Sequence, residues 1–61
     1  MKVKDKYDLN ALDVNILYMV DGCGHRTEMK TVQIFHEKNK VKEIITSKSA
    51  MKKIFEWLES E

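Results

Sequence analysis

Residues 40–58 have the clearest pattern in the chain, because a β-favouring run leads directly into an amphipathic segment. Residues 41–46 are rich in β-branched side chains, which suit a strand. Ser47 or Ser49 can then cap a helix by accepting hydrogen bonds from its first N–H groups. Apolar residues recur after this point at helical spacing: Ala50, Met51, Ile54, Phe55, Trp57 and Leu58. The sequence predicts a strand near 41–46 and a helix near 49–59, whose apolar face needs a surface to pack against.

A second strand is predicted upstream, near residues 27–36, where Thr31, Val32, Ile34 and Phe35 favour extended backbone. Residues 37–40 between the two strands are polar and predict a turn. Asn39 is the natural residue there for a left-handed backbone conformation. The two strands are therefore expected to pair antiparallel.

Residues 9–20 fit two structures. A helical period places Leu9, Leu12, Ile16, Leu17 and Val20 on one face. A strand over 13–20 is favoured by the β-branched and aromatic content and by the Asp21-Gly22 hairpin signal that follows. We expect the strand. The predicted fold is α+β, a three-stranded antiparallel sheet with a C-terminal helix (β-β-β-α, with α-β-β-α as the alternative), over residues 9–61. Residues 1–8 are expected to be a flexible leader.

The predicted strands have apolar residues on both faces, whereas a sheet with one solvated face alternates apolar and polar residues. We assign to one face Val14, Ile16, Tyr18, Val20 and Phe35, and to the other Leu17, Met19, Val32 and Ile34. One helix covers only one face, so the other needs a partner protein or a second copy of the chain. Aromatic residues are the candidate anchors for that contact, namely Tyr18, Phe35 and Trp57.

The length of 61 residues also favours self-association. A chain of this size buries only about 60% of the surface that its unfolded form exposes, so small domains often depend on disulfides, metals or oligomers. Cys23 is the single cysteine and excludes an internal disulfide, and no Cys/His set has zinc spacing. A homodimer without metal or cofactor is the expectation.

Positive charge is concentrated in residues 38–53, although the net charge of the chain is only +1. This segment holds six lysines against Glu43: Lys38, Lys40, Lys42, Lys48, Lys52 and Lys53. Such a run is a candidate nucleic-acid contact. Arg26 is the single arginine, however, and arginine supplies most bidentate contacts to bases.

No catalytic constellation is evident. Residues 21–25 bring Cys23 and His25 close together, but two such groups make neither a metal site nor a triad, and we interpret this segment as a turn. Gly22 and Gly24 fall short of any phosphate-binding loop.

The sequence thus predicts a non-enzymatic homodimeric regulator or inhibitor that acts through protein–protein contacts, of the kind common among bacterial and phage accessory proteins. Binding of nucleic acid through the lysines of residues 38–53 is the alternative. No apolar run is long enough to span a membrane, and a cytoplasmic location is expected.

Overall fold

The structure is a computed structural model that describes all 61 residues, and it confirms the α+β fold. Two short 3-10 helices open the chain, η1 (Val3–Asp5) and η2 (Leu9–Ala11). Three strands follow, β1 (Leu12–Val20), β2 (Arg26–His36) and β3 (Asn39–Thr46), and then the helix α1 (Ala50–Glu59). The alternative with a helix over residues 9–20 is wrong. Only Leu9–Ala11 is helical, because the β-branched residues that follow pair with β2.

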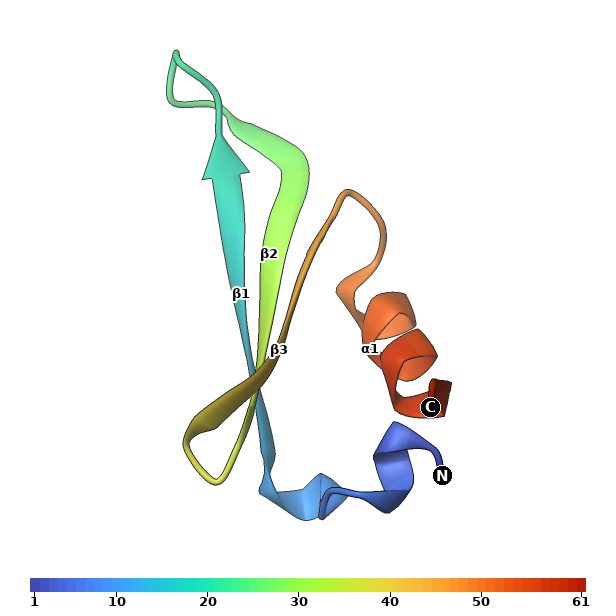
Figure 1. Cartoon of the computed structure of the whole chain (residues 1–61). Coiled ribbons are helices and arrows are strands. Elements are labelled where there is room, and N and C mark those ends of the chain that lie inside the picture. The colour runs from blue at the N-terminus through green and yellow to red at the C-terminus, as the bar shows by residue number, and fades with distance from the viewer.

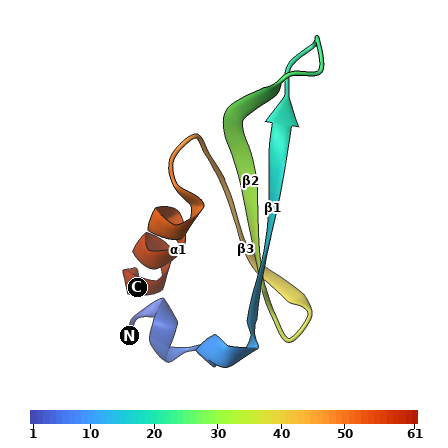
Figure 2. The ribbon, with the colours of Figure 1, turned by 180° about the vertical axis from the view of Figure 1, so that it is seen from behind.

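The strands form one antiparallel sheet in the order β1-β2-β3, and α1 lies on one side of it (Figures 1 and 2). Val32 lies opposite Ile16 on β1 and Ile44 on β3. Residues directly opposite each other in a sheet point to the same face. Lys30 and His36 alternate onto the same face as Val32. The Lys30 ammonium donates a hydrogen bond to the carbonyl of Lys48, just before α1, and the His36 ring lies against Tyr7, beside the end of α1. This face is therefore the helix side of the sheet.

The register corrects the assignment of residues to faces made from the sequence. Val14 lies opposite Ile34, so these two residues share the helix side, together with Ile16 and Val32. Phe35 lies opposite Asp13 and belongs with Leu17 on the other side. The expected grouping of Phe35 with Val14, and of Val32 with Leu17, is therefore wrong. Alternation within each strand was correct, but the register between strands depends on the loops.

The two hairpin loops differ in construction. Residues 21–25 form a loop, as predicted, in which Asp21 Oδ1 accepts hydrogen bonds from the N–H groups of Cys23 (2.8 Å) and His25 (2.9 Å). Between β2 and β3, the positive φ angles fall on Glu37 (51°) and Lys38 (71°), so the predicted left-handed Asn39 is wrong. His36 and Asn39 are paired in the sheet, which leaves a two-residue loop of the kind that needs positive φ at both positions.

Helix α1 begins after Ser49, whose side chain accepts a 3.5 Å hydrogen bond from the N–H of Lys52, as the capping prediction required. The core beneath it is small. Val32 and Ile34 are fully buried, and the helix contributes half-buried side chains from Ala50, Ile54, Trp57 and Leu58. Met51 and Phe55 share the apolar periodicity but are 61% and 58% exposed. The apolar stripe of the helix is thus wider than the sheet surface available to it.

Residues 1–8 connect the C-terminal end of α1 with the start of β1, past one end of the sheet (Figure 1). The Val3 side chain is buried there, and the Tyr7 ring lies between Trp57 (5.9 Å between ring centroids) and His36 (5.0 Å). Glu59 accepts hydrogen bonds from the ammonium groups of Lys2 (2.7 Å) and Lys4 (2.8 Å). This segment was expected to be a flexible leader. The structure gives it packed contacts, and its mobility stays a prediction.

Candidate protein-binding surfaces

The side of the sheet that faces away from α1 is not covered by any other segment of the chain (Figures 1 and 2). Thr31 on this side lies opposite Leu17 on β1 and Ile45 on β3, which makes a row across all three strands. Leu17 is 54% exposed and Ile45 is 61% exposed. Large apolar side chains left in solvent at this density are typical of interaction surfaces.

Two methionines lie next to this row on the same face, on the side toward the loop of residues 21–25. Met19 follows Tyr18 on β1, and Met29 precedes Lys30, the partner of Tyr18 on β2; both lie where the β1–β2 pairing becomes irregular. Alternation from the paired Tyr18 and Lys30 assigns both side chains to the uncovered side. They are 45% and 37% exposed. We call this surface the open-face patch: Leu17, Met19, Met29 and Ile45. Methionine is flexible and polarizable, which suits a surface that adapts to a partner.

The other end of the same face is polar. Asn15, Gln33 and Glu43 form the next row across the sheet, and the Gln33 amide donates a 3.2 Å hydrogen bond to Glu43. Phe35 lies in the row beyond, between Asp13 and Lys40. Phe35 is half-buried, so the large exposed apolar side chains of the open face are confined to the half nearest residues 21–25.

A second apolar surface lies on the helix side of β1. Val14 and Ile16 share this side with Val32 and Ile34, yet they are 42% and 40% exposed, whereas Val32 and Ile34 are fully buried. Helix α1 therefore shields β2 but leaves β1 open. Tyr18 follows Val14 and Ile16 on the same side of β1 and is 49% exposed. The Arg26 guanidinium carbon lies 4.6 Å from the centre of the Tyr18 ring. We call Val14, Ile16 and Tyr18 the β1 flank.

The three predicted aromatic anchors lie on different surfaces. Tyr18 belongs to the β1 flank, Phe35 is half-buried on the open face, and Trp57 is half-buried on α1 against Tyr7. The structure does not bring these three side chains together, so they do not form one site. The apolar residues that do lie together were missed as a group, because only the register brings Leu17 and Ile45 to the same row.

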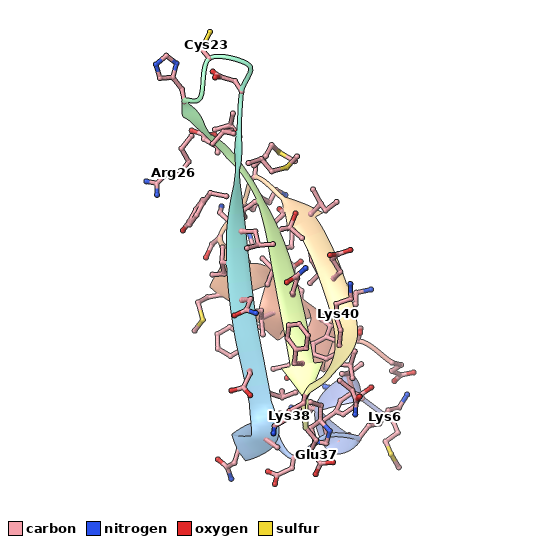
Figure 3. The ribbon with its side chains drawn as sticks, turned by 90° about the vertical axis from the view of Figure 1, so that its left-hand side faces the viewer. Lys6, Cys23, Arg26, Glu37, Lys38 and Lys40 are labelled. Carbon is pink, nitrogen blue, oxygen red and sulfur yellow. The ribbon has the colours of Figure 1, made fainter.

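The six predicted nucleic-acid contacts are also divided. Lys38 and Lys40 lie in and next to the turn at one end of the sheet, whereas residue 48 and the start of α1 follow the other end of β3 (Figure 3). Eight residues of β3 separate the two ends by about 23 Å. Two of the six lysines form ion pairs with acidic neighbours: Lys40 Nζ lies 3.6 Å from Glu43, and Lys53 Nζ lies 3.4 Å from Glu56.

Lys42 projects from β3 between the two groups, and Lys52 lies on the exposed side of the first turn of α1. The structure therefore spreads the six lysines along β3 and onto the first turn of α1 rather than gathering them at one place (Figure 1).

The Cys23 and His25 side chains are exposed at the tip of the loop, and the His25 ring nitrogen Nδ1 lies 3.7 Å from Asp21. No group of three or more histidine, cysteine or carboxylate side chains gathers anywhere in the chain. No pocket is present either. The interpretation of residues 21–25 as a turn agrees with this geometry.

None of the helices has the length and apolar character needed to cross a membrane. Comparisons of the chain with models of known protein families, with curated protein sequences and with solved structures find no match.

Proposed function

We propose that this chain is a small non-enzymatic regulator or inhibitor that acts by binding another protein, as a homodimer. The observation that carries the proposal is the open-face patch. Leu17 and Ile45 are more than half exposed on one face of the sheet, and no segment of the chain covers them. Removing apolar surface from water contributes roughly 25 cal/mol per Å², so such a patch favours a protein partner.

The shape of the patch indicates the kind of partner. The patch extends over all three strands of a twisted sheet, and such a surface fits a helix or the face of another sheet (Figure 1). Asn15, Gln33 and Glu43 border the patch on one side with hydrogen-bonding groups. Interfaces commonly combine such an apolar centre with a polar rim. The partner is therefore expected to present an apolar surface with polar groups beside it.

Photo-crosslinking tests this proposal directly. A benzophenone side chain in place of Leu17 is expected to capture one protein in the host cells, which mass spectrometry identifies. Titration of the purified partner then measures the affinity. Leu17→Glu is expected to weaken binding by at least about tenfold, because the carboxylate loses its hydration when the patch is covered.

Lys40→Glu is the matched control, because Lys40 lies on the same face but beyond the polar border, opposite Phe35 on β2. It is expected to change the affinity by less than about threefold. Equal losses for Leu17→Glu and Lys40→Glu, with both variants folded by circular dichroism, would contradict the assignment of binding to the open-face patch.

A further inference from the structure

Strand β1 forms one margin of the sheet, and no other segment of the chain runs alongside it (Figure 3). Its residues from Asp13 to Val20 are all exposed. Asp13 is the only charged residue of the strand, which also lacks lysine and proline. Edge strands of monomeric proteins normally carry such residues, because unpaired backbone N–H and C=O groups would otherwise recruit another strand.

The opposite edge shows the protection that β1 lacks. Strand β3 carries Lys40, Lys42 and Glu43 within eight residues. The irregularity in its pairing with β2 places an extra residue, Val41, on β3 itself. The pairing of β1 with β2 is also irregular, between Tyr18 and Val20, but there the extra residues lie on β2 and β1 itself stays regular. Charges and bulges of this kind discourage edge-to-edge association. Of the two edges, β1 is the one open to another strand.

The radius of gyration and the accessible surface both exceed those of a compact monomer of this length. The radius of gyration is 12.9 Å, whereas a compact domain of 61 residues has about 10.5 Å. The accessible surface is 4588 Å², about 490 Å² more than the roughly 4100 Å² of a compact monomer of 7.2 kDa. That excess approaches the roughly 600 Å² that each partner contributes to a small stable interface.

We infer that two copies of this chain pair through their β1 strands, antiparallel, with Ile16 on the two-fold axis, so that the two sheets become one. This inference specifies the dimer of the proposed function. The axis passes through Ile16 because this residue is the midpoint of Leu12–Val20, which gives the longest possible pairing. A two-fold axis perpendicular to the sheet keeps each residue on its own face, so the helix side of one copy continues into that of the other.

The chemistry of the strand favours this register. On the helix side, it places Ile16 opposite Ile16, Val14 opposite Tyr18, and Leu12 opposite Val20 of the second copy, so every pair is apolar. Asp13 meets Met19. Moving the axis by one residue to Leu17 would instead oppose Asp13 and Asp21, and like charges directly opposite each other are destabilising.

Pairing through β1 would limit the association to two chains. After β1 pairs with β1, only the two β3 strands remain as edges, and these are the ones that carry lysines and an irregular register. An isologous contact uses the same surface on both copies, so it closes upon itself. The association is therefore expected to stop at two chains rather than to form fibres.

Site-specific cross-linking tests the register. In a Cys23→Ser background, Ile16→Cys places two thiols across the axis, where the Cβ atoms of paired residues lie about 5 Å apart, close to disulfide geometry. Val14→Cys is the matched control. Its two copies would lie four residues apart along the strands, about 13 Å, and cannot form a disulfide. Mild oxidation is expected to give a covalent dimer with Ile16→Cys and none with Val14→Cys.

Light scattering supplies the second measurement. The unmodified chain is expected to show twice its 7.2 kDa mass at about 100 μM. Ile16→Lys, which opposes two ammonium groups across the axis, is expected to give a monomer. Met51→Lys, at an exposed apolar residue of α1 outside the open-face patch and the β1 flank, is expected to stay dimeric. A monomeric unmodified chain, or equal cross-linking at positions 14 and 16, would overturn the inference.

The proposed function can fail separately from this inference. If Leu17→Glu leaves partner binding unchanged while Ile16→Cys cross-links, the open-face proposal is wrong and the dimer stands. If a partner binds the open face but the chain is monomeric, only the dimer is wrong.

Discussion

The backbone N–H of Val3 donates a 2.8 Å hydrogen bond to the carbonyl oxygen of Ser60, which ties the two ends of the chain together. The Val3 side chain is only 8% exposed, in a structure where four residues are buried. The contacts of Lys2 and Lys4 with Glu59 surround this bond. The N-terminal segment thus completes the small core by holding the end of α1.

Replacing Val3 by alanine is expected to destabilise the fold by about 1.5–2 kcal/mol, since it removes two buried methyl groups and leaves a gap. Met51→Ala is the control, because the Met51 side chain is 61% exposed and its loss should cost under about 0.5 kcal/mol. Urea unfolding followed by the fluorescence of Trp57 measures both. Equal midpoints for the two variants would indicate that residues 1–8 are the flexible leader expected from the sequence.

Glu59 predicts a specific dependence of stability on pH. Hydrogen bonds from Lys2 and then Lys4 hold the pKa of the Glu59 carboxyl at about 2, below its ordinary value of 4.5. A pKa lowered by folding means that the carboxylate stabilises the fold above about pH 4.5, and that this contribution is lost as the pH falls toward about 2. The exposure of the pair makes the effect sensitive to salt.

Thermal unfolding of the unmodified chain and of Glu59→Gln checks this sign. The difference between their midpoints is expected to be largest near neutral pH and to vanish toward about pH 2. Glu61→Gln serves as the control, since Glu61 is exposed at the end of the chain and forms no ion pair. A midpoint difference between the unmodified chain and Glu59→Gln that does not change with pH would contradict the pairing of Glu59 with the two lysines.

The turn between β2 and β3 offers a stabilising change. Glu37 and Lys38 both have positive φ, which costs a side-chain-bearing residue roughly 1–2 kcal/mol each. The double variant Glu37→Asn, Lys38→Gly uses the residues that favour this turn and is expected to gain about 1 kcal/mol, a rise of roughly 4–8 °C in the melting temperature. Lys40→Gly, one residue inside β3, should instead destabilise the fold by about 0.5–1 kcal/mol. A lower melting temperature for the double variant would contradict this turn geometry.

The distribution of lysines predicts weak attraction to nucleic acid. Lys38 and Lys48 lie at opposite ends of β3, so only a few phosphates contact either group at once. Fluorescence anisotropy with duplex DNA is expected to show a salt slope corresponding to about two or three contacts and little binding at about 150 mM salt. Lys52→Glu with Lys53→Glu should reduce the slope slightly. Tight binding at that salt, lost in the double variant, would instead support the nucleic-acid alternative.

Local patterns in the sequence were sufficient for the element order. The β-branched runs, the Asp21-Gly22 signal and the serine cap before α1 each depend on neighbouring residues, and the structure confirms the strands and the helix that they predict. The contacts of residues 1–8 were not predicted, because a segment alternating lysine and aspartate has no periodicity of its own. Its burial depends on Val3 and Tyr7 meeting residues that lie fifty or more positions away in the sequence.

The candidate surfaces divide in the same way. The sequence by itself determined that apolar residues lie on both faces of the sheet and that one helix cannot cover both, because alternation along a strand is a local property. Which residues share a face was decided only by the tertiary structure. The loop lengths set the register, which placed Leu17 and Ile45 on either side of Thr31 on the open face, and Ile16 beside the buried Val32.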